Sequence, residues 1–344
     1  SLDAKLLANK KSFNTKFWGS EDEKIEIKSQ AEIDEILDYL DGKKYIVKDI
    51  RVGEKKRNPA PPFTTSTLQQ EASRKLGFAI KKTMAMAQSL YESGLITYMR
   101  TDSTRISDEA RKMAKEEIVN QFGTEFYENR YYKTKKDAQD AHEAIRPTYL
   151  NVKPEEIKEK YSYDQYKLYK LIYERLLASQ MSSAVYSTMA VDIEVGKYIF
   201  RANGSKIKFS GFMALYVEGN DEGLEEKDVV LPDLEIGQEV KLKELKPEQH
   251  FTEPPARFTE ASLVKALEEK GIGRPSTYAP TINTILDRRY IEKSEKKLYA
   301  TELGKIVTNI LVDNFGDIVN VEFTAGMENE LDRKSKEEYK KQKI

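Results

Sequence analysis

The sequence predicts a multidomain α+β protein in which a β-rich region is split by an α-helical insert and followed by a helical, winged-helix-like domain. Three observations predict this fold class. Apolar residues from Ile80 to Tyr91 recur at helical spacings, apolar residues from Val191 to Val195 alternate as in a strand, and Asn58-Pro59-Ala60-Pro61-Pro62 interrupts regular structure. The expected domains are residues 1–60 and 185–252 as the two halves of the β-rich region, residues 61–184 as the helical insert, and residues 253–344 as the final domain.

The first β-rich half contains a well-signalled helix. Ser29 suits its N-cap, Glu32 three residues later completes a capping box, and Asp41-Gly42 suits its end. The flanking runs Lys24 to Ile27 and Lys44 to Ile50 are predicted as strands.

The insert is predicted to be mainly helical. Ile80, Met84, Ala87, Leu90 and Tyr91 share one helical stripe, which Gly94 can follow as a C′ residue. Further helices are expected over residues 107–122, 154–161 and 163–181. Alternation at residues 191–195, 207–209 and 240–242 then predicts strands up to about residue 245.

The last domain follows a helix, turn, helix, hairpin, helix order. Thr259 can cap a helix through Lys270, Ser276 can open a second helix to about Arg289, and Thr301 can cap a third. The short runs at residues 290–293 and 297–300 predict a hairpin before that third helix. Such modules bind DNA and also bind proteins, so both interpretations stay open.

Composition limits the classes of site. The chain has no cysteine and two histidines, which excludes disulfides and histidine- or cysteine-rich metal sites, so a metal would require carboxylates. The net charge of −1 requires any nucleic-acid-binding surface to be local. No apolar run is long enough to span a membrane, and no signal peptide is evident at the start, so we expect a cytoplasmic protein.

The segment GLITYMRTDSTRIS, residues 94–107, places Tyr98 beside Arg100, Asp102, Ser103 and Arg105. A phenol has an ordinary pKa near 10 and is a poor nucleophile at neutral pH, but a nearby guanidinium can favour its phenolate or steady a phosphate under attack. This pattern suggests phosphoryl transfer onto tyrosine. The alternative is that Tyr98 is one of 20 tyrosines and packs beside a surface salt bridge.

Two other strings carry polar residues of interest. In AQDAHEAIRPT, residues 138–148, a helix would place Gln139, His142, Glu143 and Arg146 on one face, which could meet a polar site or simply be solvated.

The other string precedes the second helix of the last domain. Arg274, Ser276 and Thr277 lie where a helix N-terminus offers amide donors to a phosphate, although a capping turn that happens to carry arginine is the alternative.

Taken together, these strings resemble type IA DNA topoisomerases, most closely the bacterial topoisomerase I group. The likeness extends from about Leu2 to Asp332. The matching strings are PPFTTSTLQQEASRKLGF, GLITYMRTDS, AQDAHEAIRPT, GIGRPSTYAPTINTILDRRYI and FTAGMENELD, in the family's order.

The resemblance implies that Tyr98 attacks single-stranded DNA and forms a 5′-phosphotyrosine, so that resealing needs no ATP. It implies that Arg100 stabilises the phosphate and that His142 hydrogen-bonds Asp102. It assigns DNA binding to Arg274, Ser276, Thr277 and Arg288.

At the level of the whole protein, the resemblance implies a toroidal, cytoplasmic, nucleoid-associated monomer that relaxes negatively supercoiled duplex DNA. The β-rich region would form the arch of the toroid, with hinges near residues 59–62 and 182–186. The family holds Mg²⁺ in a Toprim domain that has no counterpart in residues 1–344, so we expect this chain to bind no metal itself. We therefore expect the isolated chain to bind single-stranded DNA weakly and to be inactive.

Other classes fit less well. Tyrosine recombinases and type IB topoisomerases place the tyrosine after their arginines and histidine, whereas Tyr98 precedes His142, and rolling-circle relaxases need a close histidine pair. The remaining alternative is a noncatalytic, DNA-binding gate module that needs a partner domain.

Overall fold

The computed structural model describes residues 1–132, 142–219 and 228–342, with side chains up to residue 335. The chain divides into two compact units. The first unit comprises Ser1–Asn58, Ser183–Gly211 and Glu225–Pro254, and the second comprises Pro59–Ser182, Phe212–Leu224 and Pro255–Ile344. The helical segment is therefore inserted within the sequence of the β unit. The sequence assigns residues 61–184 and 253–344 to separate domains, but both ranges lie in the second unit. The exceptions are Ser183 and Ala184 at the end of the first range and the two residues before Pro255 at the start of the second.

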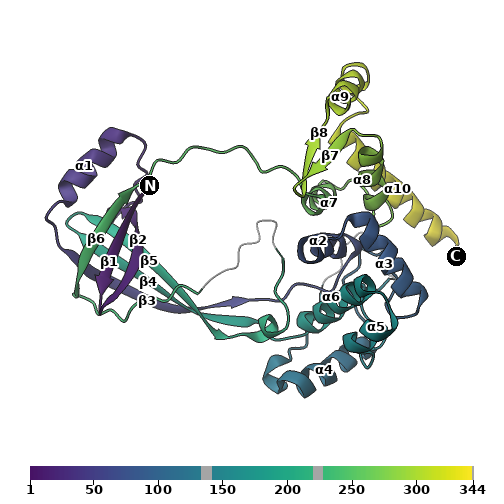
Figure 1. Cartoon of the computed structure of the whole chain (residues 1–344), viewed down its shortest axis with the longest axis horizontal. Coiled ribbons are helices and arrows are strands. Elements are labelled where there is room, and N and C mark those ends of the chain that lie inside the picture. The colour runs from purple at the N-terminus through teal and green to yellow at the C-terminus, as the bar shows by residue number, and fades with distance from the viewer. Residues whose placement is uncertain (133–141, 220–227, 343–344) are drawn as a thin grey trace. The chain divides into compact units, whose positions relative to one another are not determined.

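The first unit is a closed antiparallel barrel with strand order β1-β2-β5-β4-β3-β6 (Figure 1). Its strands are β1 (Leu2–Ala8), β2 (Lys11–Gly19), β3 (Tyr45–Arg57), β4 (Ala184–Val195), β5 (Tyr198–Phe209) and β6 (Glu239–Pro247). Apolar residues that alternate along these strands point inward and fill the barrel, as Leu2, Ala4, Leu6 and Ala8 do in β1.

Our strand prediction for residues 24–27 is wrong. Among them only Lys24 makes an isolated bridge, with Gly19. The six strands of the barrel close on one another, and Ile27 packs against their apolar core without pairing with a strand. The β1–β2 hairpin, by contrast, was missed; Asn9 and Lys10 turn it with φ angles of 50° and 63°.

The helix α1 (Gln30–Leu40) confirms Ser29 as the N-cap, whereas the Glu32 carboxylate bonds the residue before it. The Ser29 hydroxyl accepts the Glu32 N–H at 3.3 Å, and the Glu32 carboxylate accepts the Lys28 N–H at 2.7 Å. The helix buries Ile33, Ile36 and Leu40 in the barrel's apolar core, so local capping and core packing agree.

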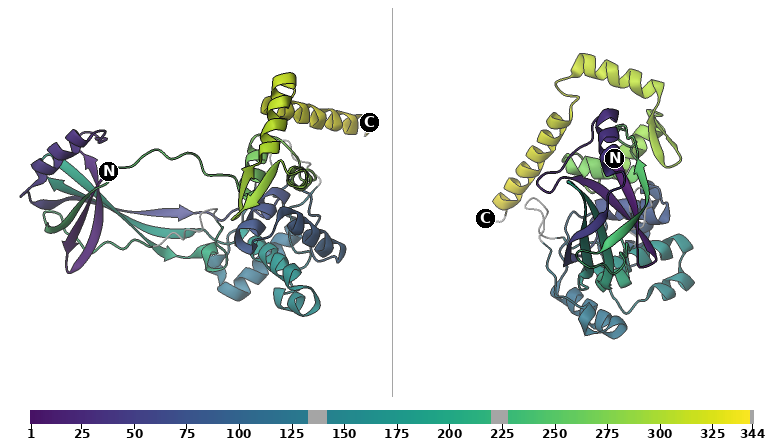
Figure 2. Two further views of the ribbon diagram at one scale, coloured as in Figure 1. Left: turned by 45° about the horizontal axis from the view of Figure 1, so that its top comes forward. Right: turned by 90° about the vertical axis from the view of Figure 1, so that its left-hand side faces the viewer.

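The strands β3 and β4 continue past the barrel core as a ribbon (Figures 1 and 2). Their pairing extends without a break from Asp49↔Asp192 to Arg57↔Ala184, whereas β6 pairs with β3 only at Tyr45 and Ile46. The outer half of β3 therefore has a free edge on one side among the residues that the structure describes.

The second unit is helical around an apolar interior. Its first part contains α2 (Thr65–Leu76), α3 (Ile80–Glu92), α4 (Asp108–Phe122), the 3-10 turn η1 (Thr124–Phe126), α5 (Pro154–Lys160) and α6 (Tyr163–Ser179). These positions confirm the helices expected near residues 80–91, 107–122, 154–161 and 163–181. The predicted stripe of α3 is buried at Ile80, Ala87 and Leu90, but Tyr91 is exposed.

The second part of this unit has the predicted order of elements. It contains α7 (Glu260–Glu269), α8 (Tyr278–Asp287), β7 (Ile291–Ser294), β8 (Lys297–Ala300), α9 (Glu302–Phe315) and α10 (Val321–Gln342). Thr259 and Thr301 are N-caps as expected, whereas α8 starts after Thr277 instead of at Ser276.

The buried helix α2 joins the two parts of the unit. Ser66 of α2 donates to Glu268 of α7 at 2.6 Å. The buried carboxylate of Glu260 accepts the Ile80 N–H at 2.8 Å and pairs with Lys293 at 2.7 Å. These polar contacts fix α7 against the helices that precede the Tyr98 segment.

Candidate active site

The Tyr98 segment begins where α3 ends. Gly94 has a φ of 72°, the left-handed conformation that glycine adopts most readily, and its N–H donates to the Tyr91 carbonyl at 2.8 Å. The Leu95 N–H then donates to the Leu90 carbonyl at 2.9 Å. The helix is thus capped, and the chain leaves it as an irregular segment that contains Tyr98.

Burial alternates along this segment. Met99, Thr101 and Ser103 are buried, whereas Tyr98 and Arg100 are exposed and Asp102 is partly exposed. Alternation of this kind leaves residues 98, 100 and 102 on the open side of the segment. The spacing in the motif is therefore what presents a phenol, a guanidinium and a carboxylate together.

Two threonines fix the backbone on either side of Tyr98. Thr97 donates from its hydroxyl to the Ala144 carbonyl at 2.7 Å, and its N–H donates to the Arg146 carbonyl at 2.9 Å. Thr65, fully buried at the start of α2, donates from its hydroxyl to the Met99 carbonyl at 2.7 Å. The same hydroxyl accepts the Thr101 N–H at 2.9 Å. Tyr98 is thus held on a backbone that is anchored immediately before and after it.

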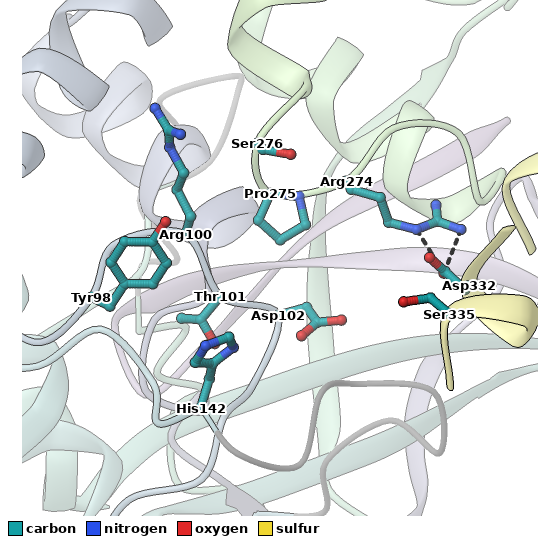
Figure 3. Close-up of a pocket in the computed structure, with 10 residues that line it drawn as sticks. All are labelled: Tyr98, Arg100, Thr101, Asp102, His142, Arg274, Pro275, Ser276, Asp332 and Ser335. Atoms are coloured by element: carbon teal, nitrogen blue, oxygen red, sulfur yellow. Dashed lines mark hydrogen bonds and ion pairs between the residues drawn. The ribbon is translucent and has the colours of Figure 1, made fainter. Parts of the chain in front are cut away.

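Tyr98 lines a pocket of about 410 Å³ (Figure 3). The lining residues are Tyr98, Arg100, Thr101, Asp102, His142, Arg274, Pro275, Ser276, Asp332 and Ser335. In Figure 3, Tyr98 and Arg100 lie on one side, Arg274 and Asp332 on the other, and the Asp102 carboxylate between them. Six of the eight predicted site residues therefore meet in one cavity although three distant parts of the sequence supply them.

The Tyr98 ring has two aromatic neighbours. Its centroid lies 5.4 Å from that of Tyr91 in an edge-to-face arrangement and 5.9 Å from that of the His142 imidazole. The ring is thereby held on the pocket wall while 38% of the Tyr98 side chain stays exposed. Among the described residues, no hydrogen bond joins His142 to Asp102, so the expected pairing is absent in this conformation.

The helical arrangement considered for the His142 string is wrong over its described part, residues 142–148. The segment is irregular: Ala144 donates its N–H to the Arg105 carbonyl, and Ile145 donates to the Phe63 carbonyl, each at 2.8 Å. Both residues are buried, so tertiary contacts on both sides of the chain outweigh any local helical preference. Arg146 pairs with Glu143 and also donates to the Pro147 carbonyl, and Gln139 lies outside the described residues.

Arg274 lies in the pocket with its guanidinium occupied. It donates to Asp332 at 2.9 Å and to Glu328 at 2.8 Å, both on α10. Glu328 also accepts the Gly273 N–H at 2.9 Å. Partial burial alone would lower the pKa of Arg274, but Asp332 and Glu328 outweigh it and raise the pKa, which keeps the guanidinium charged.

By contrast, the Arg100 side chain has no ion pair or hydrogen bond among the described residues. The pocket therefore contains one arginine without a carboxylate partner and one that is held by two carboxylates.

The other two predicted DNA-binding residues do not line the pocket. Thr277 is the N-cap of α8, and its hydroxyl accepts the Arg274 N–H at 2.8 Å. Arg288 is exposed at the opposite end of that helix. The ten residues of α8 make a helix about 15 Å long, and this length separates Arg288 from Ser276.

Sequence reasoning missed Thr65, Thr97 and Tyr91 as parts of the site. Their contacts join segments that are far apart in the sequence, and a periodic pattern of residues cannot reveal such contacts. Thr65 also belongs to a threonine-rich run that is typical of an ordinary helix start. Asp332 and Ser335 were missed because α10 was not predicted.

Between residues 1 and 342, outside the two gaps, no helix combines the length and apolarity needed to cross a membrane. In the same part of the chain, no group of three or more histidine, aspartate or glutamate side chains is arranged to hold a metal ion.

Comparison with known proteins connects this site to a family. The family described as DNA topoisomerase matches residues 1–344. Among solved structures, full-length topoisomerase I from Thermotoga maritima is similar with 38% sequence identity and a TM-score of 0.79. The match covers 96% of this chain but 54% of the Thermotoga chain, so this chain spans about half the length of that relative. A family match over the whole chain, on a mixed fold with a large antiparallel sheet, shows that the chain belongs to the bacterial type IA DNA topoisomerases.

Proposed function

We propose that this chain supplies the tyrosine nucleophile of an enzyme that cleaves one strand of DNA, passes a strand through the break and reseals it. The parent enzyme would thereby relax negatively supercoiled DNA. One observation carries this proposal: a single pocket collects Tyr98, Arg100, Asp102, His142, Arg274 and Ser276. A tyrosine whose ring is packed but whose side chain remains partly exposed suits attack on a bulky substrate.

The proposed reaction exchanges one phosphate ester for another. The Tyr98 oxygen attacks the phosphorus of a DNA phosphodiester and loses its proton, and the bond from phosphorus to the 3′ oxygen breaks. The 3′ oxygen takes up a proton, and the 5′ phosphate remains on the tyrosine. The reverse reaction reseals the strand, and because the covalent link retains the energy of the broken bond, ATP is not needed.

Charge in the pocket supports this assignment. Arg100, free of carboxylate partners among the described residues, would stabilise the negative charge that builds on the phosphate. His142 lies beside the Tyr98 ring and would hydrogen-bond Asp102 once DNA is bound. The backbone before α8, with Ser276 facing the pocket, would receive a neighbouring phosphate, while Thr277 and Arg288 would contact the strand farther away.

We place the Mg²⁺ of the proposed reaction on carboxylates of the parent protein outside residues 1–344. The described residues offer no group of three candidate ligands, and about half of the Thermotoga chain lies outside the match. Its chemistry would be to neutralise phosphate charge.

Strand passage would require the barrel unit and the helical unit to move independently of each other. Two of the unit boundaries, Asn58/Pro59 and Ser182/Ser183, fall close to the hinges inferred from the sequence. We propose that the barrel unit is the arch of a toroidal gate and that these connections bend when it opens.

Denaturant trapping tests the nucleophile. The parent enzyme is mixed with single-stranded DNA labelled at its 3′ end and Mg²⁺, quenched in denaturant and examined for labelled protein. The enzyme should form an adduct, and Tyr98→Phe should abolish it because that substitution removes only the hydroxyl. Tyr91→Phe is the matched control, since Tyr91 contacts the same ring and is 40% exposed. An adduct that survives Tyr98→Phe contradicts the proposal.

A second candidate function is a noncatalytic, DNA-binding gate module that acts with a partner domain. The occupied guanidinium of Arg274 and the absent His142–Asp102 hydrogen bond in the described structure favour it, because the site is not in a reacting arrangement. Supplying the rest of the parent protein in trans distinguishes the two: recovery of the Tyr98 adduct supports the catalytic assignment, and its absence supports the gate module.

A further inference from the structure

The outer part of the sheet in the first unit is strongly basic. We call it the basic ribbon and define it as residues 51–57 of β3, 184–190 of β4 and 203–209 of β5. It contains six lysines and arginines and one glutamate, a net charge of +5, in a chain whose net charge is −1. Such concentration of charge on one element indicates a polyanionic partner.

Three of these cations are exposed, and one of them, Lys56, lies near enough to Glu54 to help lower the pKa of its carboxyl. Lys55, Lys56 and Lys206 form no ion pair with any residue that the structure describes. The only carboxylate of the ribbon, Glu54, is already paired with Lys208. Three positive charges are therefore available to a ligand.

The free edge of the basic ribbon is formed by β3. Because β6 pairs with β3 only at Tyr45 and Ile46, the outer half of β3 presents a free edge among the described residues. Successive side chains of a strand point to opposite faces, so Lys55 and Lys56 extend to the two sides of that edge. Gly53, which pairs with Thr188, has no side chain, so the backbone of a ligand can approach the strand closely at this position.

This arrangement fits duplex DNA better than a single strand. The major groove is about 12 Å wide and admits a β-ribbon, with phosphates along both of its walls. Proteins that bind single strands combine cations with aromatic platforms for base stacking. The only aromatic residues of the ribbon, Tyr186 and Phe209, are half-buried, so the ribbon offers cations and small polar residues without such a platform.

We propose that the basic ribbon is a second DNA-binding site, which docks the free edge of β3 in a groove of duplex DNA through contacts of Lys55, Lys56 and Lys206 with phosphates. The inference takes DNA as the polyanion from the proposed function but does not depend on Tyr98 chemistry. Charged residues on an edge strand can also serve only to prevent strand-to-strand aggregation, and that alternative requires no DNA contact.

The test compares two triple variants of the 344-residue chain. The ribbon variant carries Lys55→Gln, Lys56→Gln and Lys206→Gln. The control carries Lys5→Gln, Lys241→Gln and Lys243→Gln, three exposed lysines of β1 and β6 in the same unit. Both lose the same charge, so a general electrostatic effect is matched. Binding to a labelled duplex is measured by fluorescence anisotropy between 50 and 200 mM salt.

Each phosphate contact contributes a slope of about 0.9 to the dependence of log affinity on log salt for duplex DNA, so the ribbon variant should lose about 2.7 from its slope. The ratio of the wild-type affinity to the affinity of the ribbon variant should therefore fall about 40-fold between 50 and 200 mM salt. The control should keep the wild-type slope.

Equal slopes for the two variants, or a wild-type chain that does not bind the duplex, would overturn the proposal. The proposal would also be overturned if the ribbon variant lost as much affinity for single-stranded DNA or for polyglutamate as for the duplex. The site would not then distinguish duplex DNA from other polyanions. None of these results alters the Tyr98 adduct, so failure of this proposal and failure of the proposed function remain distinguishable.

Discussion

Replacing Thr65 by valine tests whether the buried start of α2 positions Tyr98. Thr65 is 0% exposed, and its hydroxyl donates to the Met99 carbonyl and accepts the Thr101 N–H at 2.7 and 2.9 Å. Valine has a similar volume but no hydroxyl. The substitution thus removes both bonds without opening a cavity and leaves two buried backbone groups near Tyr98 without this partner.

The expected magnitude follows from those two groups. An unsatisfied buried backbone group costs about 1–3 kcal/mol, so the segment should become easier to open by at least about 2 kcal/mol. Since 1.4 kcal/mol corresponds to a factor of ten, local opening should rise roughly 30-fold. The hydrogen bond from the Thr65 N–H to the Thr101 carbonyl remains, which should keep the fold intact.

Hydrogen exchange followed by mass spectrometry measures this opening in peptides that contain residues 96–103. The matched control is Thr83→Val in α3, because Thr83 is also 0% exposed but its hydroxyl donates only to the Ala79 carbonyl of its own helix. Thr65→Val should speed exchange in these peptides and slow Tyr98 adduct formation in the parent enzyme, whereas Thr83→Val should do neither. Equal exchange and equal adduct yields in the two variants would refute the positioning role.

Three further predictions follow from the site, the barrel and the whole chain. Arg100→Gln should slow adduct formation in the parent enzyme about 100-fold, as loss of one charge-stabilising donor does elsewhere, while Arg105→Gln, outside the pocket, should have little effect in the same trapping assay. Burial would raise the pKa of Asp192, but hydrogen bonds from Arg201 and Arg51 outweigh burial and hold the pKa below its ordinary value of 3.8. This carboxylate therefore stabilises the barrel at pH values above 3.8 and loses its contribution as pH falls through the depressed pKa. Asp192→Asn should make the free energy of unfolding depend less on pH in the acid range. Unfolding can be followed by the fluorescence of Trp18, which lies against Arg201. The isolated 344-residue chain should leave supercoiled plasmid unrelaxed on agarose gels with Mg²⁺ present, and a ladder of relaxed topoisomers would contradict that expectation.

The sequence predicts elements whose signals are local. Ser29, Thr259 and Thr301 cap helices where expected, because a capping hydroxyl bonds an N–H two or three residues away. Barrel closure is not local: the first strands, β1 and β2, pair with β6 and β5, which come more than a hundred residues later. Nothing in the run at residues 24–27 shows that six other segments already close into the barrel, so the run was mistaken for a strand.

The same distinction explains the site. Tyr98, Arg100 and Asp102 could be predicted as a group because they lie within five residues of one another in the sequence, and in the structure all three are at least partly exposed. The conformation of residues 142–148 could not, since it depends on the carbonyls of Phe63 and Arg105, which meet this segment only in the folded unit. The carboxylates that occupy Arg274 belong to a helix that was not predicted at all.

The two pocket arginines should therefore differ in how they meet a phosphate. Arg274 already donates to Asp332 and Glu328, so a phosphate must replace carboxylates that are bound at 2.8–2.9 Å, and little net energy is gained by such an exchange. Arg100 has no such partner in the described part of the chain and stands on the same side of the segment as Tyr98, so its full charge is available at the point of attack. This difference favours Arg100 as the group that stabilises the transferred phosphate, and Arg274 then secures the turn before α8 against α10 while Ser276 lines the pocket.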